Sequence, residues 1–91
     1  MAKPFDNWVL TPHAIVEMQR RGIDEQTVAH VLAQPEQRTS VRAGREVAQS
    51  RMTIEGTVYI VRVFVDTDRV PAEVVTVYRT SKVAIYWRPS S

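Results

Sequence analysis

The chain has 91 residues, no cysteine, and 12 Lys plus Arg against 10 Asp plus Glu. This length predicts a single domain over residues 1–91, and the absence of cysteine excludes disulfides and thiolate zinc sites and favours a reducing compartment. The first residues form no apolar signal core, and no stretch approaches the roughly 18 to 20 apolar residues of a membrane span. We therefore expect a cytoplasmic protein with no membrane partner.

Charge is divided unevenly along the chain. Residues 1–37 carry three cations and five anions, the remainder carries nine cations and five anions, and ten of the twelve cations are arginine. Because the planar guanidinium suits phosphate, the basic second half is compatible with a surface that faces nucleic acid. An ordinary solvated surface is the commoner origin of so small an excess.

The first ten residues predict an irregular arm that packs back on the domain. Pro4 and Asp6 disfavour regular structure, yet Phe5 and Trp8 are too apolar to remain in water. We expect this arm to contribute a short edge strand.

A first helix is predicted between Thr11 and Gly22. Thr11 offers a hydroxyl for the N-cap, and Gly22 suits the left-handed C-cap. Ile15 and Met18, with Ala14 beside them, form the stripe that we expect to face inward.

A second helix is predicted between Asp24 and Pro35. Asp24 is a suitable N-cap, Ile23 can pack on Val28 as a hydrophobic staple, and Pro35 ends the helix. Two helices joined by a tight glycine turn predict a helical hairpin. Residues 25–34 contain no Lys or Arg to enter a groove of DNA, so we discount a DNA-reading helix-turn-helix.

From residue 36 onward the apolar period changes to about two, and β-branched residues dominate. Strands are predicted over residues 45–54, 57–65 and 72–80, with turns at residues 43–45, 55–56 and 66–71. The apolar strand 72–80 should lie inside the sheet, and residues 81–87 form either a last strand, which their alternation favours, or one helical turn. The expected fold is α+β, with the N-terminal helical hairpin packed on a four- to five-stranded antiparallel sheet.

The residues give little support to metal or nucleophile chemistry. His13 and His30 lie on different predicted helices, and the close pair Asp66 and Asp68 lies in a turn, where aspartate is common. We expect no metal site and no cofactor, and no serine has a supporting triad motif. His30, beside Val31, is interpreted as structural.

His13 is the better candidate for acid–base chemistry. Its place in the first helical turn disfavours imidazolium, whereas Glu17 one turn later favours it, so the protonation state near neutral pH stays open. A purely structural role, covering the start of the helix, is the competing interpretation.

Several cations are candidates for binding phosphate. Arg62 is the most informative, because a charge inside an apolar strand must reach water, a carboxylate or a ligand. Tyr78 and the cations after it gather where a strand ends, and could stack on a base, hold phosphate or simply reach solvent. The candidate phosphate ligands are Arg21, Arg45, Arg62, Arg79 and Lys82.

The segments TPHAIVEMQRRGIDEQTVAHVLAQPE, GREVAQSRM and VVTVYRTSK together resemble a bacterial domain of unknown function, DUF4258, which is grouped with the RelE-like toxins, barnase and colicin nucleases. The resemblance covers nearly the whole chain and implies a RelE-like fold and metal-independent RNA cleavage by the toxin of a toxin–antitoxin pair. His13 and Arg21 match the family pattern. Glu17 departs from it, since an arginine often stands there, which implies lost activity, an altered substrate, or a role for Glu17 in orienting His13.

Three functional hypotheses follow. The first is a ribonuclease toxin in which His13 or Tyr78 transfers protons, Glu17 partners His13, and the arginines and Lys82 stabilise the phosphate. The second is a non-catalytic module that binds RNA or protein. The third is an interaction domain that forms a homodimer through an exposed apolar edge, for which Trp8, Tyr86 and Trp87 are the candidates. The expected partners are accordingly RNA, a small antitoxin protein or a second copy of the chain.

Overall fold

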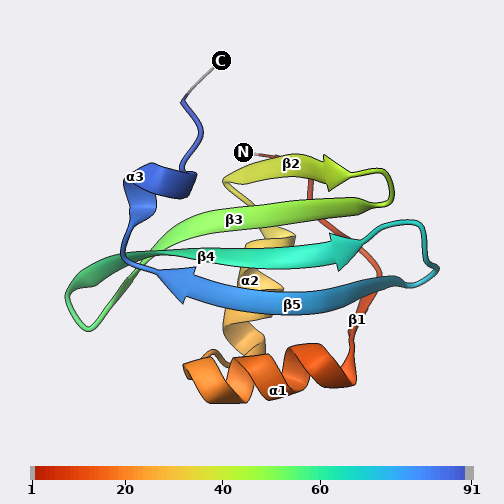
Figure 1. Cartoon of the computed structure of the whole chain (residues 1–91), viewed down its shortest axis with the longest axis horizontal. Helices are drawn as coiled ribbons and strands as arrows, with labels where there is room; N and C mark the ends of the chain where they lie inside the picture. Colours follow the sequence, from red (N-terminus) through yellow and green to blue (C-terminus); the bar gives the residue numbers. More distant parts are fainter. Residues whose placement is uncertain (1, 90–91) are drawn as a thin grey trace.

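The computed structural model describes residues 2–89, which form one five-stranded sheet with helices on both of its faces (Figure 1). The strands lie in the order β1-β5-β4-β3-β2. In chain order the elements are β1 (Trp8–Leu10), α1 (Pro12–Arg21), α2 (Glu25–Ala33), β2 (Gln37–Arg42), β3 (Arg45–Ile54), β4 (Thr57–Asp66), β5 (Ala72–Thr80) and α3 (Val83–Tyr86).

The predicted α+β class is confirmed, but the sheet is mixed and not antiparallel. β2, β3, β4 and β5 pair antiparallel, whereas β1 pairs parallel with β5, with Trp8 opposite Ala72 and Leu10 opposite Val74. The expected edge strand in the N-terminal arm is therefore present. After β1, α1 runs along β5 in the same direction, from Thr11 beside Val74 to Arg21 beside Val77 (Figure 1).

The predicted caps of both helices are confirmed. The backbone N–H of Ala14 donates to Thr11 Oγ1 at 3.1 Å, and that of Thr27 donates to Asp24 Oδ1 at 2.8 Å. Gly22 ends α1 with a φ of 65°, a left-handed conformation that glycine adopts without steric cost. The caps satisfy backbone groups that a helix end would otherwise leave unpaired.

The core lies between α1, α2 and one face of the sheet, which we call the inner face. Val28, Val31 and Leu32 of α2 are fully buried there, as predicted. The expected stripe of α1 is only partly correct, because Ile15 is 42% exposed while Glu17 is 8% exposed. Glu17 can occupy the inward position because two arginines bind its carboxylate, as described below.

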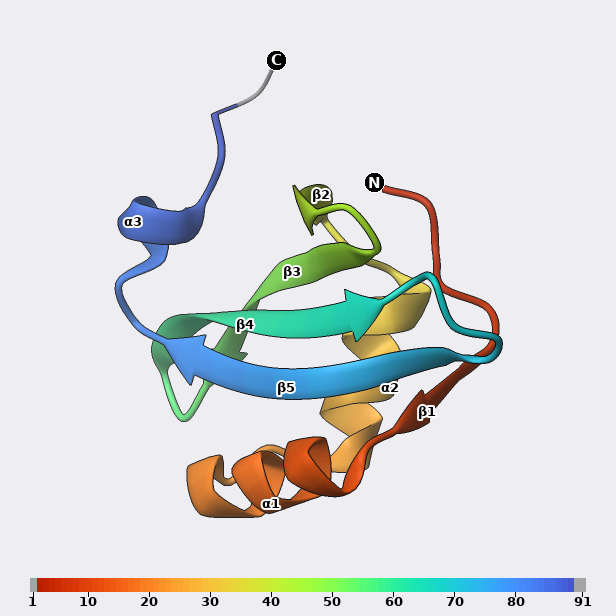
Figure 2. The ribbon, with the colours of Figure 1, turned by 45° about the vertical axis from the view of Figure 1, so that its right-hand side comes forward.

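The two N-terminal helices do not lie side by side. α1 runs along β5, while α2 crosses behind the strands at a steep angle to α1 (Figures 1 and 2). The hairpin arrangement expected for a RelE-like fold is therefore not confirmed.

The chain after β5 forms a short helix, and the strand favoured for residues 81–87 is wrong. β4 pairs along one edge of β5, while β1 pairs with residues 72–74 on the other edge and α1 packs along β5. The chain instead turns onto the other face of the sheet, the outer face, where α3 contacts β4. Ile60 points to this face and is fully buried beneath the segment.

Candidate functional site

Four polar side chains form a row straight across the outer face of the sheet, which we call the transverse row. Gln37, Gln49, Arg62 and Tyr78 come from β2, β3, β4 and β5, and each lies directly opposite the next in the strand register. Residues directly opposite in neighbouring strands project from the same face. The sheet therefore brings together two residues that the sequence singled out, Arg62 and Tyr78, and two that it did not.

The row is a continuous chain of hydrogen bonds. Gln49 Nε2 donates to Gln37 Oε1 at 2.7 Å, Arg62 Nε donates to Gln49 Oε1 at 2.9 Å, and Arg62 Nη1 donates to the Tyr78 hydroxyl at 2.5 Å. Gln49 is only 1% exposed. A buried amide is stable only when its polar atoms are paired, and each partner here fixes the orientation of the next.

The half-buried guanidinium of Arg62 has no carboxylate partner among residues 2–89. Arg20, Arg21, Arg38, Arg45 and Arg51 all form ion pairs there. Arg62 instead lies 4.6 Å from the ring centroid of Tyr86 and 5.2 Å from that of Phe64. A guanidinium has five N–H donors, and within the described chain Nη2 of Arg62 donates to no protein atom.

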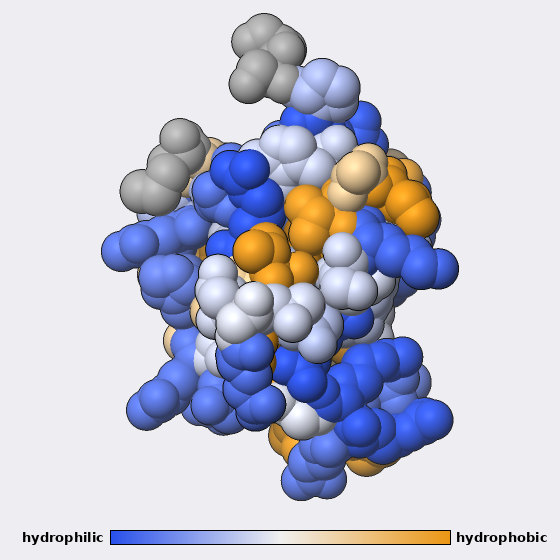
Figure 3. Space-filling model, turned by 90° about the vertical axis from the view of Figure 1, so that its left-hand side faces the viewer, coloured by the Kyte–Doolittle hydropathy of each residue, from blue (hydrophilic) through white to orange (hydrophobic). Residues whose placement is uncertain are grey.

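A hollow of about 370 Å³ opens beside Arg62. It is lined by Arg62, Ile85, Tyr86, Trp87, Arg88 and Pro89. Figure 3 views the end of the molecule that carries α3 and shows apolar side chains there among hydrophilic ones. The hollow thus combines a cation from the sheet with apolar and aromatic walls from the C-terminal segment, an environment suited to a phosphate joined to a flat ring.

The C-terminal segment, residues 83–89, is held on the outer face by side chains of β2 and β3. Gln37 Nε2 donates to Arg88 O at 2.7 Å, and Gln49 Nε2 donates to Tyr86 O at 3.0 Å. The guanidinium of Arg51 stacks on the Trp87 ring at 3.8 Å. Trp87 and Tyr86 are therefore half-buried in the site and are not a free apolar edge.

Arg45 also projects from the outer face, but its guanidinium is paired with the carboxylate of Asp66. Its Nε donates to Asp66 Oδ1 at 2.6 Å and its Nη2 donates to Asp66 Oδ2 at 3.2 Å. Hydrogen bonding to Arg45 is the main cause that holds the pKa of Asp66 below its ordinary value, against the opposing effect of burial. Arg45 is thus less available to phosphate than Arg62.

Glu17 and Arg21 form a separate cluster where α1 faces β5. Glu17 accepts from Arg21 at 2.6 Å and from Arg20 at 3.0 Å, and Arg21 also donates to Val77 O at 3.1 Å. Burial raises the pKa of Glu17, but the charges of Arg21 and Arg20, the hydrogen bond from Arg21 and a smaller effect of His13 together lower it below its ordinary value. Glu17 therefore orients arginine and forms no hydrogen bond with His13.

Arg79 and Lys82 do not join the transverse row. Arg79 follows Tyr78 in β5 and so projects to the inner face, where its guanidinium lies 4.8 Å from the Tyr59 ring centroid. Lys82 is exposed on the turn between β5 and α3. The predicted phosphate ligands are thus distributed over both faces of the sheet.

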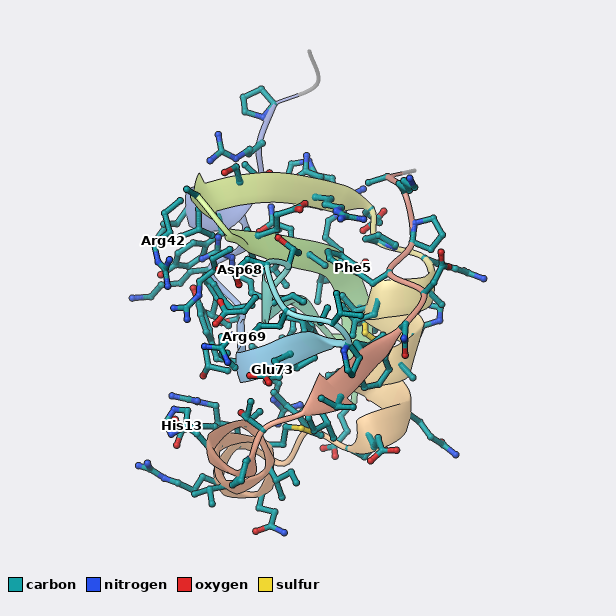
Figure 4. The ribbon with its side chains drawn as sticks, turned by 90° about the vertical axis from the view of Figure 1, so that its right-hand side faces the viewer. Phe5, His13, Arg42, Asp68, Arg69 and Glu73 are labelled. Atoms are coloured by element: carbon teal, nitrogen blue, oxygen red, sulfur yellow. The ribbon has the colours of Figure 1, made fainter. Side chains whose placement is uncertain are left out.

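His13 is exposed in the first turn of α1, away from the predicted cluster at the end of β5. Figure 4 shows it at the end of the molecule that also carries Arg69 and Glu73. Arg79 is near the other end of α1, since a Cβ on Gly22 would lie 4.0 Å from Arg79 Nη2. At 1.5 Å per residue the helix separates His13 from Gly22 by about 13 Å. His13 and Tyr78 therefore do not share one centre.

Residues 2–89 contain no cluster of three or more His, Asp or Glu side chains that could hold a metal ion. None of the helices formed by these residues has the length and apolar character that crossing a membrane requires.

Gln37, Gln49 and Arg88 were not predicted from the sequence as residues of this site. One signal was available for Gln49. The two-residue turn at Glu55 and Gly56 fixes the hairpin register, and that register places Gln49 opposite Arg62.

Comparison with known proteins gives one family. The model of a domain of unknown function, DUF4258, matches residues 10–79, which include β3, β4 and nearly all of β5. No curated protein and no solved structure matches the chain.

Proposed function

Because the chain belongs to the DUF4258 family, a domain of unknown function, we propose that it is a metal-independent endoribonuclease of the RelE-like, barnase and colicin superfold that binds RNA on the outer face. In this proposal the protein is the toxin of a toxin–antitoxin pair, and an antitoxin protein covers the same face. The family resemblance in the α1 region and the arginine bias of the second half motivate the choice of RNA.

One observation carries the proposal. Arg62 holds a half-buried positive charge without an ion-pair partner in residues 2–89, and it faces a hollow of about 370 Å³. A charge in such a position is stabilised by an anion, and RNA supplies one in its phosphodiester together with bases that can stack on Tyr86 or Trp87. The opening is of a size that suits a single nucleotide.

The chemistry proposed is transesterification. The ribose 2′-oxygen attacks the adjacent phosphorus, a new O–P bond forms, and the bond from phosphorus to the 5′-oxygen breaks, which leaves a 2′,3′-cyclic phosphate and a 5′-hydroxyl. The 2′-hydroxyl gives up one proton and the leaving oxygen receives one. Arg62 stabilises the negative charge on phosphorus-bound oxygens, and Tyr78, whose oxygen accepts from Arg62, keeps its own proton to donate to the leaving oxygen. Water accepts the proton of the 2′-hydroxyl, since His13 lies elsewhere.

The direct test is incubation of the purified protein with mixed cellular RNA in EDTA. We expect fragments that end in a 2′,3′-cyclic phosphate, and growth arrest when the protein is expressed without an antitoxin. Arg62→Met should abolish both effects, whereas Arg69→Met, at an exposed turn, should leave them unchanged. Intact RNA at high protein concentration together with normal growth would refute the enzymatic proposal.

A second candidate is a non-catalytic module that binds RNA or protein with the same face. The separation of His13 from Tyr78 favours it, because only Tyr78 is then a candidate for proton transfer at the transverse row. RNA binding that weakens with salt and depends on Arg62, without cleavage, would support this candidate over the enzyme.

A further inference from the structure

The two glutamines of the transverse row connect Arg62 to the C-terminal segment. Gln49 accepts from Arg62 Nε through Oε1 and donates through Nε2 to both Gln37 and Tyr86 O. Gln37 in turn accepts from the backbone N–H of Arg88 at 3.1 Å and donates to Arg88 O at 2.7 Å. These contacts join the sheet and the segment at both Tyr86 and Arg88.

The chemistry of Arg62 sets the direction of this chain. A guanidinium can only donate, so Gln49 must present its oxygen to Arg62 and its nitrogen to Gln37. Gln37 must then present its oxygen to Gln49, which leaves its nitrogen for Arg88 O. The orientation of Arg62 and the position of residues 86–88 are therefore parts of one hydrogen-bonded unit.

The segment also forms the wall of the hollow that Arg62 faces. Tyr86, Trp87 and Arg88 line it, so an anion bound to Arg62 touches both the sheet and the segment. Arg88 is exposed and brings a second positive charge to the rim. An anion held between the two arginines draws the segment toward the sheet.

We infer that Gln37 and Gln49 are positioning residues that couple anion binding at Arg62 to the seating of the C-terminal segment. The inference deepens the proposed function, since it concerns the same site, but it requires only an anion and not RNA. Such coupling is reciprocal: the factor by which a bound anion stabilises the seated segment equals the factor by which the seated segment raises the affinity for the anion. A variant that unseats the segment must therefore weaken anion binding.

The test uses the full chain, labelled with ¹⁵N and titrated with inorganic pyrophosphate. NMR follows the Arg62 Nε–Hε signal for binding and the hydrogen exchange of the Arg88 amide for seating. In the unmodified protein we expect pyrophosphate to shift the Arg62 signal and to slow exchange at Arg88. The informative variant is Gln37→Met, because Gln37 contacts Arg88 but not Arg62. It should speed exchange at Arg88 and weaken pyrophosphate binding at Arg62 about 5-fold or more, the low end of typical coupling.

Two further variants make the test specific. Gln26→Met changes an exposed glutamine of α2 and should alter neither signal. Arg51→Lys keeps the charge but weakens the stacking on Trp87, so it should loosen the segment and weaken pyrophosphate binding without touching either glutamine of the row. It also serves if Gln37→Met does not fold.

The outcomes separate this inference from the proposed function. The coupling is overturned if Gln37→Met speeds exchange at Arg88 but changes the pyrophosphate affinity at Arg62 less than 2-fold. It is also overturned if the Arg62 signal of the unmodified protein does not respond to pyrophosphate. Coupling with pyrophosphate but no affinity for RNA supports the inference and refutes the proposed function alone.

Discussion

Replacement of Gln49 by methionine removes the centre of the transverse row while keeping nearly the same side-chain length. Gln49 is 1% exposed and makes hydrogen bonds to Arg62, Gln37 and Tyr86 O. A neutral hydrogen bond contributes about 0.5 to 1.5 kcal/mol and one to a charged group about 1.5 to 3 kcal/mol, so the three together contribute about 2.5 to 6 kcal/mol. Water reaching Arg62 recovers part of this, and we expect a loss of about 3 kcal/mol in the free energy of unfolding.

Urea denaturation followed by far-UV circular dichroism measures this loss. A domain of this class is stable by about 5 to 15 kcal/mol, so Gln49→Met should still fold but with a lower transition midpoint. The matched control is Gln26→Met, at an exposed position of α2, which should change stability by about 0.5 kcal/mol or less. The reasoning is refuted if Gln49→Met unfolds within about 0.5 kcal/mol of the unmodified protein, because the row would then contribute nothing.

Three other predictions test the separate parts of the site. Tyr78→Phe keeps the ring that stacks on Phe64 but removes the proton donor, so RNA affinity should persist while cleavage falls about 100-fold or more. His13→Ala should change the rate of cleavage less than about 3-fold, and a larger effect in a cleavage time course would contradict the assignment of proton transfer to Tyr78. The pKa of Glu17 is lowered in the folded state, so its stabilising effect is complete above its ordinary pKa of 4.5 and is lost as the pH falls through its folded-state pKa. Glu17→Gln should therefore flatten the acid side of a plot of melting temperature against pH, and an unchanged plot would argue against the arginine cluster. Gly22→Ala should destabilise the protein by about 1 kcal/mol in urea, since φ is 65° while no atom obstructs the added methyl group, and an unchanged midpoint would indicate that the cap is not strained.

Much of the fold is readable from local sequence. Thr11, Gly22 and Asp24 mark helix ends because their side chains, or the lack of one, satisfy the backbone locally. The strand at residues 81–87 was wrong because an alternating pattern says nothing about whether a sheet edge is free to accept it. The motif match makes His13 the best candidate in the sequence, but a motif match cannot show where α1 lies. In the folded protein α1 runs along β5, so the first turn of α1, which carries His13, lies far from Arg79.

Only part of the transverse row can be predicted from the sequence. The turn at Glu55 and Gly56, both with positive φ, determines that Ile54 faces Thr57 and therefore that Gln49 faces Arg62. This half of the row depends only on counting along two strands joined by a tight turn.

Tertiary structure decided the other half. A register shift between Phe64 and Val65 places Tyr78 opposite Arg62; without it Val77 would lie there. A second shift, between Ser40 and Arg42, places Gln37 opposite Gln49. Such shifts arise where an extra residue is accommodated in one strand, and packing of the whole sheet decides their positions. The sequence by itself determined that a charged side chain would stand in the sheet at Arg62, and only the folded sheet determined which side chains would hold it.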